Sequence, residues 1–235
     1  GNDAAGVFCE VEGERGAVDA FVRRAVDDAP PLAVIESVEV TERAPEGRRG
    51  FVIVSSQGGE TGSPVALVPP DTATCPDCLA EVMDPSNRRH GYAFTNCTHC
   101  GPRLSIIHGI PYDREQTSMA AFTMCASCQG EYDSPADRRF HAQPNACAAC
   151  GPHVGLYTGR REPVETADPI KTAADLIRRG QILAVKGLGG YHLAVDATHS
   201  DAVKRLRRRK LREEKPFAVM SAGLEAIRQY AVVRP

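Results

Sequence analysis

The sequence predicts an α+β protein built of several small domains around a central metal-binding module. Three observations support this: eight of the nine cysteines fall into Cys-x-x-Cys pairs, the paired region repeats at an offset of fifty residues, and both flanks show helix and strand periodicities. At 235 residues, the chain has room for one large domain or for two to three small ones.

The paired cysteines divide into two equal groups with the spacing Cys-x2-Cys-x18-Cys-x2-Cys. Each group supplies four thiolates, which is the ligand set of a closed, tetrahedral structural zinc site. We therefore expect two structural Zn²⁺ ions in place of an apolar core. The predicted ligands are Cys75, Cys78, Cys97, Cys100, Cys125, Cys128, Cys147 and Cys150.

The repeat extends beyond the predicted ligands. The same offset superposes Glu81 on Glu131, Pro85 on Pro135, Arg88-Arg89 on Arg138-Arg139, and Gly101-Pro102 on Gly151-Pro152. Two tandem fingers explain this pattern, and they favour sequential sites, one in each repeat. Interleaved sites and a set of disulfides remain alternatives, although the regular pairing in a chain of this length is atypical of a secreted disulfide scaffold.

Composition limits the function classes. The formal net charge is −2, and no apolar run approaches the length of a membrane span, so we expect no membrane partner and consider nucleic acid an improbable one. The sequence contains no recognisable signal peptide, and paired free thiols suit a reducing compartment. Both points predict a cytoplasmic protein.

The first segment, 1–58, has the pattern of a small α+β unit. Alternation predicts strands at 6–12, 35–41 and 51–55, and apolar residues at helical spacing predict a helix over 17–29 that ends before Pro30. Cys9 falls on the apolar face of the first strand, so we expect a small core residue there. The glycine- and serine-rich stretch 57–64 reads as a linker.

The last segment, 166–235, alternates helix and strand signals. Ile170, Ala173, Ala174, Leu176 and Ile177 share one helical face, and Gly180 stands where a C-terminal cap is expected. An apolar strand over 182–185 leads into the glycine-rich turn 186–192. A second strand over 193–195 and a basic helix over 200–211 follow.

A glycine-rich turn beside a basic helix suits a phosphate-bearing ligand, because backbone N–H groups can approach its oxygens while lysine and arginine neutralise charge. The turn matches neither a Walker motif nor G-x-G-x-x-G. A tight turn beside a solvated basic helix face, or a nucleic-acid patch, are the alternatives.

Several motifs resemble the double zinc-finger region of the HypF family, the carbamoyltransferases of [NiFe]-hydrogenase maturation. The motifs are Cys75-Pro76-Asp77-Cys78, Phe94-Thr95-Asn96-Cys97-Thr98-His99-Cys100-Gly101-Pro102-Arg103, Pro111-Tyr112-Asp113-Arg114 and Arg138-Arg139-Phe140-His141-Ala142-Gln143-Pro144-Asn145. The resemblance spans nearly the whole chain. It implies an acylphosphatase-like (ferredoxin-like) segment at 1–58 lacking its beginning, an irregular double zinc-finger domain at 68–158, and a YrdC-like α/β segment at 166–235 lacking its end.

The resemblance also implies an activity. In that family, carbamoyl phosphate is cleaved in the acylphosphatase-like domain, and the carbamate reacts with ATP to give a carbamoyl-adenylate in the YrdC-like domain. A further domain passes the carbamoyl group to the C-terminal cysteine of a HypE-type partner, on the way to the cyanide ligand of the hydrogenase. We expect this chain to be a fragment of such an enzyme, inactive by itself.

The site residues implied by the resemblance are few. Asn2 resembles the acylphosphatase asparagine that orients the attacking water, although a turn asparagine is an equal alternative. The residues implied to surround ATP, with Mg²⁺ in the complete enzyme, and the carbamate are Lys186, Tyr191, His192, Lys210, Arg212 and Lys215.

Five histidines lie near the predicted fingers. Eight thiolates already saturate two tetrahedral zinc ions, so we expect structural or surface roles for His90, His99, His108, His141 and His153. A second hypothesis for the whole chain is a zinc-finger module that binds protein or RNA without catalysis.

Overall fold

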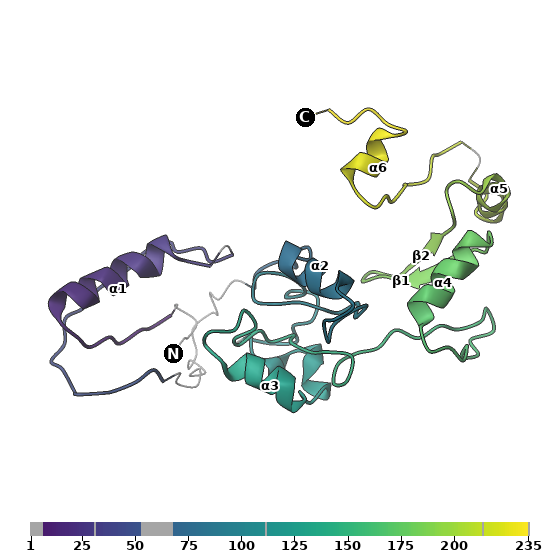
Figure 1. Ribbon diagram of the computed structural model, residues 1–235. Helices are drawn as coiled ribbons and strands as arrows, with labels where there is room; N and C mark the ends of the chain where they lie inside the picture. Colours follow the sequence, from purple (N-terminus) through teal and green to yellow (C-terminus); the bar gives the residue numbers. More distant parts are fainter. Residues whose placement is uncertain (1–6, 31, 53–67, 111, 213, 235) are drawn as a thin grey trace. The chain divides into compact units, whose positions relative to one another are not determined.

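The computed structural model describes residues 7–30, 32–52, 68–110, 112–212 and 214–234. The chain forms two compact units, Gly1–His153 and Val154–Pro235 (Figure 1). Helices and a two-stranded sheet make up the regular structure of these residues, in agreement with the predicted mixed α/β class. None of the helices in the described ranges is long and apolar enough to cross a membrane.

The N-terminal segment contains the predicted helix but not the predicted strands. Helix α1 spans Arg15–Asp27, two residues earlier than expected, and ends before Pro30. The described parts of 6–12, 35–41 and 51–55 contain no strand, apart from an isolated bridge at Val7. Asn2 and the predicted linker 57–64 lie outside the described residues.

The strand prediction failed for a physical reason. Alternation selects one apolar face, but a strand also needs a neighbour for its N–H and C=O groups, and the described residues of this segment supply no such ladder. Its apolar side chains consequently stay exposed, among them Val7, Val40 and Phe51. The prediction of Cys9 as a core residue is wrong as well, because its thiol is exposed and free.

Each finger repeat begins with a short helix that starts directly after its first cysteine. Helix α2 spans Pro76–Met83 and α3 spans Ala126–Asp133, in register with the fifty-residue repeat. Cys75 and Cys125 are the N-cap residues of these helices. Two 3₁₀ turns, η1 (Arg114–Gln116) and η2 (Ser118–Ala121), lie between the repeats.

The interior of the finger module is largely cysteine and polar. One cluster consists of Cys78, Cys97 and Cys100 with Cys75 packed against it, and a second, small apolar cluster forms around Tyr92, Met119 and Ala146. The largest fully buried side chain of the described chain is Arg89, followed by Asn145. A module with so little apolar burial depends on other interactions for its stability.

The second unit contains the predicted helix–hairpin–helix order. Helix α4 (Pro169–Arg178) leads to the antiparallel strands β1 (Leu183–Lys186) and β2 (Tyr191–Ala194), and then to α5 (Ser200–Arg209) and α6 (Leu224–Arg228). The hairpin register pairs Lys186 with Tyr191. Strand β2 therefore starts inside the stretch that the sequence suggested as a turn.

The end of α4 confirms the predicted glycine cap. Gly180 has φ +76°, its N–H donates to Ile177 O at 2.8 Å, and the N–H of Gln181 donates to Leu176 O at 2.9 Å. These two hydrogen bonds form a Schellman motif. A Cβ at this position would lie 2.7 Å from Nε2 of His199, the N-cap residue of α5, so the missing side chain lets the two helix ends approach.

We predict that Gly180→Ala destabilises the second unit by roughly 1 to 2 kcal/mol, because alanine is strained at positive φ and its Cβ meets His199. Hydrogen exchange of the α4 and α5 amides measures the effect. Gly159→Ala is the matched control, since its added Cβ meets no atom within 4 Å. Equal protection in both variants would contradict the prediction.

Candidate metal centre

The structure brings the eight paired cysteines into two groups, one within each repeat. Cys75, Cys78, Cys97 and Cys100 form the first group, and within each group every Sγ lies within 4.8 Å of the other three. The second group contains Cys125, Cys128, Cys147 and Cys150. The grouping is sequential rather than interleaved, and all nine cysteines of the chain are free thiols.

The spacing of the sulfur atoms fits a tetrahedral metal ion. Cys97 Sγ lies 3.8 Å from the Sγ atoms of both Cys75 and Cys100, and the corresponding distances around Cys147 are also 3.8 Å. A tetrahedron with Zn–S bonds of about 2.3 Å has S–S edges of about 3.8 Å. Four soft donors at this spacing fit zinc in both groups.

Local backbone geometry positions these sulfurs. The Cys78 N–H donates to Cys75 Sγ at 3.5 Å at the start of α2, and the His99 N–H donates to Cys97 Sγ at 3.3 Å in the opposite turn. Backbone N–H groups and the helix N-terminus favour negative charge on sulfur. Burial would raise the pKa of Cys75, but hydrogen bonds from the Cys78 N–H and from the thiols of Cys78, Cys100 and Cys97 outweigh this effect and lower the pKa to about 7.

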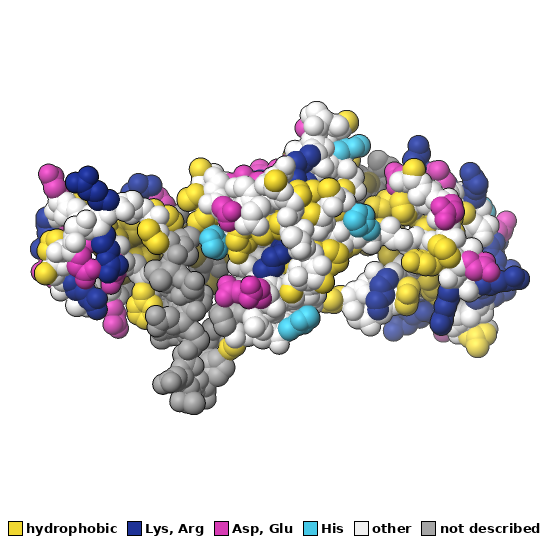
Figure 2. All heavy atoms as spheres, turned by 90° about the horizontal axis from the view of Figure 1, so that it is seen from below, with side chains coloured by type: hydrophobic (Ala, Val, Ile, Leu, Met, Phe, Trp, Pro, Cys, Tyr) yellow, Lys and Arg dark blue, Asp and Glu magenta, His cyan; other side chains and the backbone are white. Residues whose placement is uncertain are grey.

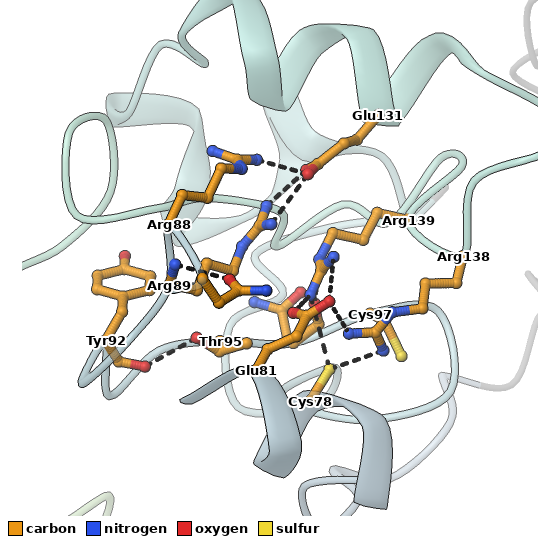
Figure 3. Close-up of polar contacts among 12 residues, drawn as sticks. Cys78, Glu81, Arg88, Arg89, Tyr92, Thr95, Cys97, Glu131, Arg138 and Arg139 are labelled. Atoms are coloured by element: carbon orange, nitrogen blue, oxygen red, sulfur yellow. Dashed lines mark hydrogen bonds and ion pairs between the residues drawn. The ribbon is translucent and has the colours of Figure 1, made fainter. Parts of the chain in front are cut away.

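An exchange of side chains joins the two repeats. Arg89, from the first repeat, donates to both carboxylate oxygens of Glu131 on α3, at 2.9 and 2.5 Å. In the reverse direction, Arg139 forms the same two-pronged contact with Glu81 on α2. Figure 3 shows each arginine pair pointing toward the glutamate of the other repeat. Each repeat therefore supplies the arginine that pairs with the glutamate of the other repeat.

The neighbouring arginines reach the cysteines themselves. Arg88 donates to Cys128 Sγ at 3.4 and 3.5 Å. In the other repeat, Arg138 donates to Cys78 Sγ at 3.1 Å, a contact that Figure 3 shows. Each of them also pairs with the glutamate of the opposite repeat at 2.6 Å. Each four-cysteine group thus receives an outer hydrogen-bond donor from the other repeat.

The charges are mutually stabilising. Burial would raise the pKa of Glu131, but hydrogen bonds and charge from Arg89 and Arg88 outweigh this effect and lower its pKa to about 2. Burial raises the pKa of the Cys128 thiol to about 12 although Arg88 opposes the shift. A bound metal cation would favour the thiolate form of such a buried cysteine.

Buried hydrogen bonds fix the arginine planes. Arg89 Nε donates to Ala146 O at 3.1 Å, and Arg139 Nε donates to Asn96 O at 2.9 Å, which are equivalent positions in the two repeats. Asn145, fully buried, accepts from Arg89 Nη2 at 3.0 Å and donates to Cys128 O at 2.9 Å. The buried guanidinium groups are therefore hydrogen-bonded on several sides, as burial of a charge requires.

Glycine after the last cysteine of each repeat has two different roles. Gly101 adopts φ +93°, and a Cβ there would lie 2.6 Å from Asn96 Cβ. Gly151 has no positive φ, but a Cβ there would overlap Tyr92 Oη and approach Ala146 Cβ to 2.5 Å. Backbone conformation therefore favours glycine at Gly101, whereas close packing requires it at Gly151.

No histidine belongs to either four-cysteine group. His141 illustrates a structural role: it has φ +51° at the position where the first repeat has Gly91 at +68°. Its ring lies 4.8 Å from that of Tyr132 and 4.6 Å from that of Phe140. These ring contacts hold His141 in a left-handed backbone conformation that non-glycine residues seldom adopt.

The residues expected around ATP form two groups within the second unit. Lys186, Tyr191 and His192 lie together on the β1–β2 hairpin, with Lys186 Nζ 5.4 Å from the Tyr191 ring centroid. Arg212 donates to Lys215 O at 3.3 Å and lies over the Phe217 ring. Among the described residues, no hydrogen bond, ion pair or ring contact joins the hairpin group to Lys210, Arg212 and Lys215.

Basic side chains cover much of the second unit. Figure 2 shows lysine and arginine gathered on the part of the chain that carries α4 and α5. Arg207 and Arg212 both stack on Phe217, at 4.8 and 5.6 Å from the ring centroid, while the side chains of Lys210 and Lys215 are exposed. The exposed lysines remain candidates for contact with a phosphate.

Sequence reasoning did not predict the arginine–glutamate exchange. The fifty-residue offset already aligned Glu81 with Glu131 and Arg88-Arg89 with Arg138-Arg139. The shared offset indicates that these residues occupy equivalent positions in the two repeats, but it does not say whether an arginine pairs within its own repeat or with the other. Only the three-dimensional structure resolves this choice.

Comparison with known families agrees with this geometry. Residues 74–107 and 124–157 match the family described as "HypF finger", and residues 175–234 match the Sua5/YciO/YrdC family described as "Telomere recombination". The two finger matches contain the two cysteine groups, one in each.

Whole-chain relatives carry carbamoyltransferase names. The chain is 54% identical over 230 residues to "Carbamoyltransferase HypF2" of Cupriavidus necator, covering 97% of this chain and 28% of the relative. It is 53% identical over 237 residues to "Carbamoyltransferase HypF" of Rhodobacter capsulatus, covering 98% and 30%. The chain therefore spans less than a third of the length of these relatives.

Two solved structures share the fold. Full-length HypF in a phosphate- and nucleotide-bound form matches with a TM-score of 0.83 and 46% identity, over 95% of this chain and 29% of that one. HypF of T. kodakarensis matches with a TM-score of 0.84 and 44% identity, over 96% and 28%.

We predict that Glu131→Gln destabilises the finger module by about 3 kcal/mol, because it leaves the buried Arg89 without its counter-charge. Chemical denaturation at pH 7 and constant free zinc measures the change in the free energy of unfolding. Hydrogen exchange of the α3 amides measures the local effect. Asp133→Asn is the matched control on the same helix, since both carboxylate oxygens of Asp133 accept exposed hydrogen bonds from Gln129 Nε2.

The pH dependence follows from the lowered pKa of Glu131. Its ordinary value is 4.5 and its folded value about 2, so its carboxylate stabilises the fold fully above pH 4.5 and loses this effect as pH falls toward 2. The stability difference between the native chain and Glu131→Gln should be constant above about pH 5.5 and narrow below it. A difference that widens on acidification contradicts this assignment.

Proposed function

Because the chain belongs to the HypF family over almost its whole length, we propose that it is the zinc-finger-containing part of a carbamoyltransferase. In this proposal, two structural Zn²⁺ ions occupy the two four-cysteine groups. The observation that supports it best is the tetrahedral spacing of four sulfurs within each of two matched HypF fingers.

The zinc ions supply folding rather than chemistry. Four thiolates fill a tetrahedral site and leave no open position for water or substrate. The chain's own residues hold the sulfurs: short helices begin directly after Cys75 and Cys125, and Arg88 and Arg138 of the opposite repeats donate to the sulfurs. The module would therefore connect its neighbours as a rigid element, and its free thiols suit the cytoplasm.

Catalysis is proposed for the longer protein. There, carbamoyl phosphate would be cleaved, and the carbamate would react with ATP to form a carbamoyl-adenylate and pyrophosphate. The carbamoyl group would then pass to the C-terminal cysteine of a HypE-type partner, with AMP as the leaving group. Excluding bulk water between these steps would protect the unstable carbamate. Asn2 is proposed to orient the water that attacks carbamoyl phosphate.

The second unit is the proposed ATP-binding part. Lys186 with Tyr191 and His192 on the hairpin, and Lys210, Arg212 and Lys215 after α5, are proposed to surround the ATP phosphates, with Mg²⁺, and the carbamate. The exposed lysines can turn toward phosphate, whereas Arg212 is held by backbone carbonyl groups and by Phe217. The positive charges would neutralise the triphosphate.

We predict two zinc ions per chain by elemental analysis, with loss of α2 and α3 hydrogen-exchange protection when a strong chelator removes them. Cys78→Ser should lower the zinc content, because this buried sulfur belongs to the first group. Cys9→Ser is the control and should keep two zinc ions, since Cys9 is exposed and outside both groups. A native chain without zinc would refute the metal assignment.

In the full-length protein, we predict that Lys210→Ala or Lys215→Ala reduces pyrophosphate release from ATP in the presence of carbamoyl phosphate by at least about tenfold, the scale of a lost charge–phosphate contact. Lys171→Ala, on α4, is the control for a lysine outside the proposed site. Salt-dependent RNA binding without pyrophosphate release would instead support the binding-module hypothesis.

A further inference from the structure

The fingers exchange the residues that surround their metal sites, and this exchange has a consequence for metal loading. Helix α2 carries a cysteine ligand, Cys78, and one turn later Glu81. Both face the arginine pair of the other repeat, since Arg138 donates to Cys78 Sγ at 3.1 Å and pairs with Glu81 at 2.6 Å. Helix α3 presents Cys128 and Glu131 to Arg88 and Arg89 in the same manner.

The arginines are themselves positioned by the metal site of their own repeat. Asp84, which ends α2, accepts from the Ser86 N–H at 2.9 Å, and Asn87 accepts from the Arg89 N–H at 2.9 Å. The Gly91 N–H then returns to Val82 O on α2 at 2.9 Å. The loop that presents Arg88 and Arg89 is therefore attached to the helix that the first cysteine group anchors.

The second repeat is built in the same way. Asp137 accepts from the Arg139 N–H at 2.8 Å, and the His141 N–H donates to Tyr132 O on α3 at 3.0 Å. Ordering either helix thus orders the arginine pair that completes the opposite site. Two elements that order each other through shared contacts bind their ligands with positive coupling.

Charge supports this coupling. A zinc ion with four thiolates carries a net charge of −2, so each filled site attracts the arginine pair that faces it. A cleft of about 560 Å³ lies between the repeats and is lined by both arginine pairs and both glutamates. The four arginines of the cleft face two glutamates and, when both sites are filled, two zinc–thiolate groups. The negative charges then outnumber the positive ones, so the cleft has no excess positive charge to bind an added anion.

We infer that the two zinc sites load as one cooperative unit, with Arg88 and Arg138 as positioning residues that each complete the metal site of the opposite repeat. This inference rests on the proposed zinc binding. The arginine exchange would then do more than hold the two repeats together, because zinc bound in one finger raises the zinc affinity of the other. A coupling of about tenfold lies within the ordinary range for linked sites.

Native mass spectrometry of the whole chain tests this inference, with free zinc buffered so that half of all sites are filled. Independent equal sites leave about one half of the chains with a single zinc ion, whereas tenfold coupling leaves about one quarter. We expect one quarter or less. At saturating zinc, the same measurement reads the total, and a total near zero refutes the zinc assignment rather than the coupling.

Variants separate coupling from affinity. Arg88→Gln with Arg138→Gln keeps all eight cysteines and should raise the singly loaded fraction toward one half, while two zinc ions still bind at saturation. Arg88→Lys with Arg138→Lys keeps the charge but not the planar fork, and should give an intermediate fraction. Arg178→Gln with Arg228→Gln is the matched control, because both arginines form exposed ion pairs with nearby acids.

A second measurement covers unequal sites. Cys125→Ser with Cys128→Ser empties the second site, and competition with a chelator should then show about tenfold weaker zinc binding at the first. Unchanged affinity at the first site, together with a singly loaded fraction of one half in the native chain, would overturn the inference.

Discussion

The finger module depends on one constraint: two clusters of thiolates must be brought together in a chain segment that has little apolar surface to bury. The described interior contains Cys78, Cys97, Cys100 and Cys128 at one per cent exposure or less, next to a buried Arg89. Thiolates repel one another and buried guanidinium groups are costly, so neither set is stable alone. A metal ion inside each cluster, with an arginine pair outside it, would remove both penalties together.

In each repeat, a few neighbouring residues are enough to make these contacts. Glu81 and Glu131 each lie three residues after a buried cysteine, hence one helical turn away on the same face. A single pair of adjacent arginines can then contact a thiol and a carboxylate at once, as Arg138 and Arg139 do. Because the pair comes from the other repeat, a single finger would lack its charge partners.

Sequence reasoning predicted what local chemistry determines. Cysteine spacing predicted the two sites, apolar periodicity predicted α4, and Gly180 marked a helix end that the structure confirms as a Schellman cap. It failed where a partner decides the outcome. The alternation at 35–41 encodes a face but cannot supply a neighbouring strand, and Arg88-Arg89 cannot indicate which glutamate they bind.

In the second unit, some cationic side chains make structural contacts and others are exposed to solvent. Arg207 donates to Arg212 O and Lys215 O, and both Arg207 and Arg212 stack on Phe217, so these guanidinium groups hold the turn after α5. Lys210 and Lys215 keep their side chains exposed on that turn. Because the arginine contacts stiffen this turn, the backbone of Lys210 and Lys215 is held in place while their ammonium groups can still move. On this turn the guanidinium groups are engaged by carbonyl oxygens and by the Phe217 ring, whereas the ammonium groups are exposed and can meet an anion.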